Sequence, residues 1–440
     1  MHECDARPAR DCWADLKKSF RQIHGSICAS RGFKCAAVFC DIKKLGTGKG
    51  SQKGRKDDLA VIVSSAPAAV AGMFTTNQVC AAPVKVSRKV AARDFARAIV
   101  VNSGNANAAT GAQGMRDAET MARLTAKALS LNPNQVLVCS TGRIGVPMPM
   151  KNVERGVRRC APLLARSTPN ARQVARAIMT TDTRRKEIAV EFKIGQSTVR
   201  IGGICKGAGM IRPGMATMLG FITTDAAVGS AELKRALKVA VEQSFNRITV
   251  DGDMSTNDSV IALANGLARN SKSQIAHSQF QDALNFVCLQ LAKMIVSDGE
   301  GTSRFVALHV HGARNDREAE AAARSIANSS LVRTSWCGGD PNWGRILCAL
   351  GYSKADVDES LVDVGYALTD NRKILFAFRR SRPTNVPLKR LAKITSASEF
   401  DLHIDLHRGR GEFVLYAADL TEDYVALNKG DITDPTTLGG

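Results

Sequence analysis

A glycine-rich segment that leads to a threonine is the part of the chain whose residue types first suggest chemistry. Residues 206–226 read KGAGMIRPGMATMLGFITTDA, so glycines and Pro213 precede Thr217, which directly follows the small Ala216. A threonine hydroxyl is a weak nucleophile unless a base lies beside it, and the α-amine of an N-terminal threonine is such a base. An α-amine has an unperturbed pKa of about 7.7–8.0, so a large fraction is neutral at cellular pH.

Thr217 is internal, so this chemistry requires cleavage of the Ala216–Thr217 bond. The hydroxyl can attack the preceding carbonyl to give an ester, which water then hydrolyses. Glycines and a small Ala216 permit the strained backbone that this attack needs. The same pattern is also typical of a glycine-rich turn that enters a buried strand, and the residues alone favour this plainer interpretation.

Two segments resemble ligand-binding loops but lack an essential residue. Residues 46–54, GTGKGSQKG, do not have the GxxxxGK[ST] spacing of a phosphate loop, so we interpret them as a basic loop. The segment that begins DGDMSTND at Asp251 is similar to a calcium loop. Gly252 occupies its second position and no acidic residue occupies the twelfth, which argues against calcium.

The histidines and cysteines do not predict a metal site. His403, Asp405 and His407 alternate with apolar residues, which indicates a solvated polar face of a strand rather than a metal site. The twelve cysteines are scattered, and Cys139, Cys288 and Cys348 have apolar neighbours, which is typical of reduced core thiols. No Ser/His or Cys/His pair in the sequence supports a conventional catalytic triad.

Length and composition indicate a soluble globular protein. A chain of 440 residues predicts two domains or lobes, and 44% hydrophobic with 23% charged residues is ordinary for a folded chain. No apolar run approaches the roughly 18 residues of a membrane span, so we expect no membrane association. The first 30 residues contain four acidic residues and no apolar h-region, unlike a secretory signal or a transit peptide. These features predict a cytoplasmic protein, with a processed organellar form as the alternative.

Positive charge is concentrated in the first half of the chain. Residues 1–216 contain 36 Lys and Arg against 14 Asp and Glu, a net charge of +22, whereas residues 217–440 contain 25 against 27. A basic half is compatible with nucleic-acid binding. However, only 5% of residues are aromatic and no nucleic-acid-binding signature is present. We therefore interpret the basic clusters at 43–44, 53–56, 158–159 and 184–186 as solvated faces and expect no nucleic-acid partner.

Hydrophobic periodicity predicts a mixture of strands and helices along the whole chain. Strands are expected at 58–66, 96–104, 136–142, 305–311, 401–407 and 413–419. Helices are expected at 115–129, 151–165 and 280–294, and a further helix begins after Ser230 as its N-cap. The fold class is therefore α/β, without strict enough alternation for a doubly wound sheet.

Several blocks of sequence, in the same order, resemble the ornithine acetyltransferase family, also called glutamate N-acetyltransferase. The segment 206–226 is similar to the self-cleavage segment of that family. The other blocks include VVNSGNANAATG (100–111), CSTGRIG (139–145), FNRITVDGDMSTNDS (245–259) and GGDPNWGRI (338–346). The resemblance extends from about Gly32 to the C-terminus.

The resemblance implies a precursor that cleaves itself before the threonine. It implies an α chain of residues 1–216, with 1–31 as a variable N-terminal extension, and a β chain of residues 217–440 that begins Thr-Met-Leu. The two chains remain associated, in an α2β2 heterotetramer, and need not be independent folding domains. The implied architecture is an αββα layered sandwich, shared with the self-cleaving aminopeptidases.

The resemblance also implies roles for individual residues. Thr217 is the nucleophile, and Thr141 with Gly142 stabilises the oxyanion, where donors aimed at the developing charge lower the barrier. Substrate-binding positions match at Thr180, Lys206, Glu300, Asn428 and Thr433. A lysine ammonium is a suitable partner for a substrate carboxylate, and a carboxylate at Glu300 can hold a substrate amino group.

The implied reaction is a ping-pong transfer of acetyl from N2-acetyl-L-ornithine to L-glutamate through an acetyl-threonine, in the cyclic route of arginine biosynthesis. It requires no cofactor and no metal. Acetyl-CoA is an additional substrate if the enzyme is bifunctional, which no sequence feature decides. The alternatives are a related self-cleaving amidase or aminopeptidase, in which water is the acceptor, and a basic nucleic-acid-binding protein.

Overall fold

The chain divides into two compact units in the computed structural model, which describes residues 20–43, 56–212, 218–271, 275, 279–369 and 373–429. Among the described residues, the larger unit contains those within 20–246, 253–298 and 427–429, and the smaller unit contains those within 247–252 and 299–426. The boundary expected between residues 216 and 217 falls inside the larger unit. The two expected processing products therefore do not coincide with the compact units.

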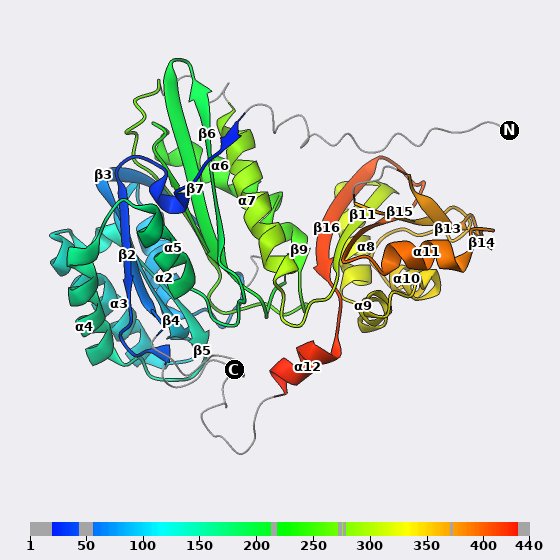
Figure 1. Ribbon diagram of the computed structural model, residues 1–440, viewed down its shortest axis with the longest axis horizontal. Helices are drawn as coiled ribbons and strands as arrows, with labels where there is room; N and C mark the ends of the chain where they lie inside the picture. The colour runs from blue at the N-terminus through cyan, green and yellow to red at the C-terminus, as the bar shows by residue number, and fades with distance from the viewer. Residues whose placement is uncertain are drawn as a thin grey trace. The chain divides into compact units, whose positions relative to one another are not determined.

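The larger unit contains a nine-stranded sheet and six α-helices among its described residues (Figure 1). Its strands are β1 (Arg21–Gln22), β2 (Phe33–Val38), β3 (Leu59–Phe74), β4 (Phe95–Asn105), β5 (Val136–Arg143), β6 (Lys186–Ile194), β7 (Ser197–Lys206), β8 (Leu219–Thr224) and β10 (Ser259–Ala264). Its helices are α2 (Ala82–Ala91), α3 (Gly111–Leu129), α4 (Met150–Cys160), α5 (Thr168–Ala177), α6 (Ser230–Glu242) and α7 (Phe280–Ser297).

The long strand β3 divides this sheet into two halves. Its first residues pair with β2 and β4, whereas its last residues pair with β10, which continues through β8 and β7 to β6. The register of β3 against β4 shifts between Val63 and Ala68, around Pro67. A proline that cannot donate to the ladder is tolerated at such an irregularity. The strand therefore continues past position 66, where the sequence pattern predicted its end.

The two half-sheets pack face to face between helices. Alternate residues of β3 show the division, because Ile62 faces the inner core shared with Phe221 of β8, whereas Val61 faces α3 and α4. The far side of β7 packs on α7, where Gly203 lies against Leu291. Figure 1 shows the same order, with α3 and α4 beyond β2 and with α6 and α7 beyond β6 and β7. The αββα layering expected from the resemblance is thus present within the larger unit.

The smaller unit is a seven-stranded sheet with order β14-β13-β12-β15-β11-β16-β9. Its elements are β9 (Ile248–Thr249), β11 (Phe305–Ala313), α8 (Asp316–Ala327), α9 (Ser330–Cys337), α10 (Trp343–Gly351), β12 (Asp363–Ala367), β13 (Leu375–Arg379), β14 (Arg382–Pro383), α11 (Leu388–Thr395), β15 (Glu399–Asp405) and β16 (Gly411–Ala418). The boundary between the units falls inside α12 (Glu422–Asn428), after Ala426. The helices share one apolar core with one face of the sheet, around Trp336 and Phe400.

Most elements lie where periodicity predicted them, and four local expectations are corrected. Ser230 is the first residue of α6 and not its cap, because Gly229 occupies the N-cap position. β15 ends at Asp405, and His407 has a left-handed φ of 49°, so the alternating polar face does not reach His407. Cys348 is exposed, unlike the buried Cys139 and Cys288.

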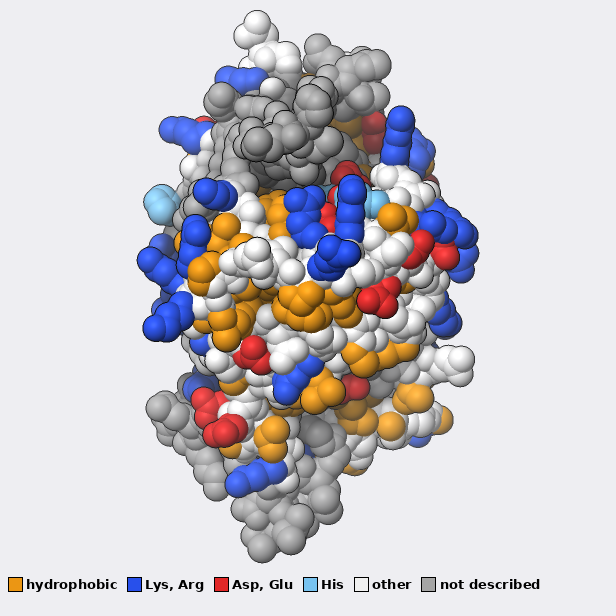
Figure 2. All heavy atoms as spheres, turned by 90° about the vertical axis from the view of Figure 1, so that its right-hand side faces the viewer, with side chains coloured by type: hydrophobic (Ala, Val, Ile, Leu, Met, Phe, Trp, Pro, Cys, Tyr) orange, Lys and Arg blue, Asp and Glu red, His pale blue; other side chains and the backbone are white. Residues whose placement is uncertain are grey.

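The fourth correction concerns the basic clusters, which are not all solvated. Arg158 and Arg159 are exposed as expected, but Lys186 is buried and Lys43 is half-buried. Lys and Arg side chains are prominent on the face of the molecule shown in Figure 2, among small groups of hydrophobic side chains. None of the helices in the described part of the chain is long and apolar enough to cross a membrane.

Candidate active site

Five strand ends meet at one edge of the larger unit. They are the C-terminal ends of β4, β5 and β7 and the N-terminal ends of β8 and β10. Asn257, which precedes β10, ties the half-sheets together, because its Nδ2 donates to the carbonyl oxygens of Ala106 at 2.6 Å and Ser140 at 2.9 Å. Residues from five separate parts of the sequence are therefore neighbours at this edge.

The expected oxyanion pair lies at the end of β5. Thr141 is buried, and the next residue, Gly142, has a φ of +128°. A Cβ at Gly142 would lie 2.3 Å from the carbonyl carbon of Gly104 at the end of β4. Only glycine fits both the positive φ and this close backbone contact, so the sequence fixes the path of the chain after Thr141.

Lys206 brings the end of β7 to the end of β5. It is the last residue of β7 and is buried. Its Nζ lies 3.3 Å from Oγ1 of Thr141 and donates a hydrogen bond to it. The structure thus places an expected substrate-binding residue beside an expected oxyanion residue, although they are 65 positions apart.

Asp182 connects Thr180 to this pair. One carboxylate oxygen, Oδ2, accepts a hydrogen bond from the Thr180 amide at 3.0 Å, and the other accepts one from the Gly207 amide at 2.7 Å. Burial acts to raise the pKa of Asp182, but the positive charges of Lys186 and Lys206 together with the Gly207 amide hold that pKa below its ordinary value. Asp182 is therefore ionised. Its two hydrogen bonds link the loop that contains Thr180 to Gly207, which follows Lys206.

A buried ion-pair network supports Asp182 from behind. Nζ of Lys186 lies 2.7 Å from Oδ1 of Asp182 and 2.6 Å from Oδ2 of Asp298, the residue that ends α7. Burial acts to lower the pKa of Lys186, but the two carboxylates raise it above its ordinary value. Asp298 also accepts a hydrogen bond from the Thr183 amide at 3.1 Å, so the network anchors the loop before β6.

Asp258 anchors the start of β8. Its Oδ1 accepts a hydrogen bond from the backbone nitrogen of Met218 at 2.9 Å, and the Ser259 amide donates to the Met218 carbonyl at 3.0 Å. Burial raises the pKa of Asp258 well above its ordinary value, despite the opposing effect of Lys206. Its other oxygen, Oδ2, is buried and has no hydrogen-bond partner among the described residues. Burial therefore favours the neutral form of the carboxyl, in which it can donate a hydrogen bond.

A second lysine, Lys43, lies close to the same groups. Its Nζ donates to the carbonyl oxygens of Asp57 at 3.1 Å and Ala177 at 3.2 Å. Burial lowers the pKa of Lys43 to about 8, with Asp58 opposing that shift. Lys43 belongs to the cluster at 43–44 that was expected to be solvated. Its closeness to Gly104 and Asp182 in the fold makes it a candidate binding residue.

The remaining expected site residues lie outside the described residues or within two residues of a boundary between the two units. Ala216, Thr217 and Thr433 lie outside the described residues. Glu300 belongs to the smaller unit, and Asn428 is the last residue of α12. Their roles stay predictions.

The assembled edge has the chemistry of a site for a small carboxylate-bearing molecule. The ammonium groups of Lys43 and Lys206 suit a carboxylate. Thr141 adds a hydroxyl group beside Lys206, and Asp258 adds a carboxyl group that holds the Met218 amide. Among the residues that the structure describes, the one cluster of three or more metal-ligand side chains lies elsewhere, in the smaller unit.

Comparisons with known proteins agree with the residue-level resemblance. A model of the ArgJ family matches residues 35–431. The arginine biosynthesis bifunctional protein ArgJ of Symbiobacterium thermophilum is 46% identical over 409 residues, which cover 92% of this chain and 98% of that protein. Glutamate N-acetyltransferase of Methanocaldococcus jannaschii is 43% identical over 415 residues, covering 93% and 98%.

Solved structures include a related chain. The crystal structure of ornithine acetyltransferase complexed with ornithine, from Mycobacterium tuberculosis, is 34% identical, with a TM-score of 0.40, and covers 44% of this chain and 98% of that chain. The match of the family model over most of the chain, together with relatives at 43–46% identity over nearly their whole length, identifies the family. The chain belongs to the ArgJ family.

Proposed function

We propose that the protein is a glutamate N-acetyltransferase that moves the acetyl group of N2-acetyl-L-ornithine to L-glutamate in arginine biosynthesis. The names of the relatives support the reaction class. The observation that carries the proposal is the hydrogen bond between the Met218 amide and Asp258, directly after Thr217 and beside Lys206. The covalent neighbour of the proposed nucleophile is thus fixed at the edge that holds Thr141 and Lys206.

The proposed nucleophile arises by self-cleavage. Oγ of Thr217 attacks the carbonyl carbon of Ala216, the peptide C–N bond breaks, and the resulting ester is hydrolysed by water. The products are an Ala216 carboxylate and a free Thr217 α-amine and hydroxyl. Lys206 and Leu219 are register partners on β7 and β8, so the cleaved segment joins two paired strand ends.

Strand pairing supports continued association of the two proposed chains. After cleavage at residue 217, β8 and β10 belong to the β chain, while β7 and β3 belong to the α chain. β8 pairs with β7, and β10 pairs with β3, so the strands of the two chains interleave in one sheet. We therefore propose αβ pairs held by main-chain hydrogen bonds, assembled further as an α2β2 heterotetramer.

The acyl transfer follows from the same groups. The Thr217 amine takes the hydroxyl proton as Oγ attacks the acetyl carbonyl, and Thr141 with Gly142 stabilises the oxyanion. The acetyl C–N bond breaks, the proton passes to the leaving amine, and ornithine departs. The amine of glutamate then attacks the acetyl-threonine ester and releases N-acetylglutamate. Lys206 and Lys43 hold substrate carboxylates, and no cofactor takes part.

A ping-pong assay tests the proposal. Purified protein is incubated with N2-acetyl-L-ornithine, with and without L-glutamate, and ornithine, N-acetylglutamate and acetate are measured. We expect continued turnover, with ornithine and N-acetylglutamate in equal amounts, only with glutamate present; without glutamate, at most one ornithine per active site is released as the acetyl-threonine forms. Equal ornithine release without glutamate, with acetate as coproduct, would instead establish the amidase alternative. Replacing N2-acetyl-L-ornithine with acetyl-CoA shows whether the enzyme is bifunctional, as the name of the Symbiobacterium relative suggests.

A further inference from the structure

Three histidines gather on one face of the sheet in the smaller unit. On β11, Leu308 and Val310 point into the apolar core, so His309 and His311 lie on the opposite face. The parallel register places His403 of β15 directly opposite His309. Neighbouring strands lie about 4.8 Å apart, so this register makes the imidazoles of the two strands neighbours.

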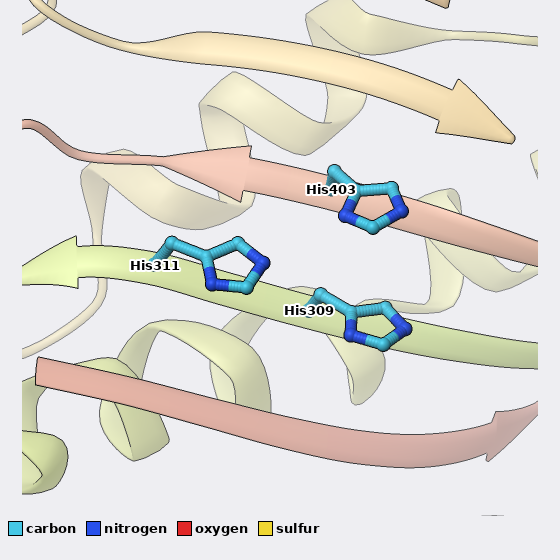
Figure 3. Close-up of side chains that lie close together, drawn as sticks. All are labelled: His309, His311 and His403. Carbon is cyan, nitrogen blue, oxygen red and sulfur yellow. The ribbon is translucent and has the colours of Figure 1, made fainter. Parts of the chain in front are cut away.

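The three rings form a compact stack (Figure 3). The centroids of His309 and His403 are 4.6 Å apart, and the centroid of His311 lies 6.1 Å from that of His309 and 6.0 Å from that of His403. The rings are nearly parallel, with interplanar angles of 10–14°. One ring nitrogen from each histidine lies within 4.8 Å of those of the other two.

Carboxylates flank the two histidine rings of β11. Oδ2 of Asp401 lies 3.7 Å from Nε2 of His309, and Oε2 of Glu412 lies 3.8 Å from Nδ1 of His311. Metal-bound histidines commonly present their second nitrogen to a carboxylate, which orients the ring and makes it a better ligand.

The third ring, His403 of β15, is partly buried. Its Nδ1 is buried without a hydrogen-bond partner among the described residues. Burial lowers the pKa of His403 to about 4, with a further contribution from His311.

We propose that His309, His311 and His403 bind one divalent transition-metal ion. Three imidazoles form a donor set that suits zinc, copper and nickel rather than magnesium or calcium. Zinc–nitrogen bonds are about 2.0–2.1 Å long, so two nitrogens on one ion are at most about 4.2 Å apart. Rotation about side-chain bonds turns the rings out of the stack and brings the nitrogens together. A fourth position remains for water or a small ligand.

The ion can reach the site from solvent, because the side chains of His309 and His311 are 21% and 26% exposed. Its position between β11 and β15 means that the ion would cross-link two neighbouring strands. None of the three histidines belongs to the proposed acyl-transfer machinery, so metal binding can be tested independently of acetyltransferase activity.

The test uses the full-length, tag-free protein after dialysis against a chelator. Zinc chloride is titrated in competition with a chromophoric zinc chelator, and bound zinc is counted by elemental analysis. We expect one zinc per chain and an affinity at least tenfold lower in His403→Gln. His407→Gln is the matched control, because His407 lies on the same unit outside the cluster, and its affinity should stay within about twofold of the wild type.

A second variant keeps the proposal testable if His403→Gln does not fold. His311→Gln removes a partly exposed ligand, and circular dichroism of the metal-free variants checks their fold. Visible absorption of the cobalt-substituted protein should indicate nitrogen ligation and change in both ligand variants. The proposal is overturned if the wild type binds no stoichiometric zinc, or if folded His311→Gln and His403→Gln bind zinc as tightly as the wild type.

Discussion

The backbone nitrogen of Met218 donates a 2.9 Å hydrogen bond to Oδ1 of the buried Asp258, 40 residues further along the chain. Met218 directly follows Thr217 in the sequence, so Asp258 binds the chain one residue after the proposed nucleophile. Burial raises the pKa of Asp258, whereas the positive charges of Lys186 and Lys206 hold the pKa of Asp182 below its ordinary value. The pKa values of two aspartates near one lysine are therefore shifted in opposite directions.

Asp258→Asn should stabilise the protein increasingly as pH rises. An asparagine keeps the acceptor for the Met218 amide but has no proton to retain. The folded-state pKa of Asp258 is raised, so the folded wild type binds one more proton than the unfolded chain above about pH 3.9. Wild-type stability is therefore lost with rising pH, by about 1.4 kcal/mol per pH unit, until the raised pKa is passed.

Urea unfolding at pH 5, 6 and 7 measures this difference. Both proteins carry Thr217→Ala, so that the chain is continuous in each. The stability of Asp258→Asn relative to the parent should increase across the series. A difference that is constant with pH would mean that Asp258 is ionised in the folded protein.

Lys186→Met should be strongly destabilising. The substitution leaves the buried carboxylates of Asp182 and Asp298 without their shared cation. Removal of one partner from a buried ion pair costs about 3–5 kcal/mol. Urea denaturation measures the loss, and Lys193→Met, which alters an exposed lysine on the same strand, is the control. Equal stability of the two variants would show that the network contributes little.

Gly142→Ala should damage the end of β5. The added methyl group meets the backbone of Gly104, and the φ of +128° is one that alanine rarely adopts. We expect a loss of at least about 2 kcal/mol of stability, or more than tenfold of acetyl transfer in the fraction that folds. Gly229→Ala, at a position with open space, should change neither quantity. A fully active, equally stable Gly142→Ala protein would contradict the proposed fixed oxyanion pair.

Lys206→Gln should weaken substrate binding more than folding. The amide keeps a donor for Thr141 but removes the positive charge that the proposal assigns to a substrate carboxylate. A charged hydrogen bond contributes about 1.5–3 kcal/mol, which corresponds to a rise of about 10–150-fold in KM for the substrate it holds. Steady-state kinetics with each substrate measures this change, and unchanged KM values for both would remove Lys206 from the binding site.

Local sequence signals predicted the elements well but not the packing between them. Periodicity is a short-range property, so it predicted the positions of β4, α3 and α7. The resemblance to the family indicated Thr141, Thr180 and Lys206 as site residues. The described structure joins these three residues through Asp182.

The residues that the sequence did not reveal depend on distant partners. Lys186 is adjacent to two arginines in the sequence, and its role follows from Asp298, 112 positions away. Similarly, His403 lies beside His309 only because β15 pairs with β11. No pattern within a single sequence encodes such contacts. The need for glycine at position 142 likewise becomes visible only when the ends of β4 and β5 lie side by side.

The most direct test of the account is the N-terminal sequence of the freshly purified protein after separation on a denaturing gel. If Thr217 is released as the N-terminal nucleophile, the wild type gives two bands of similar size, one of which begins Thr-Met-Leu, and Thr217→Ala gives a single full-length band. A single full-length band from an active wild-type preparation would contradict it, because Thr217 would then have no free α-amine to act as the base.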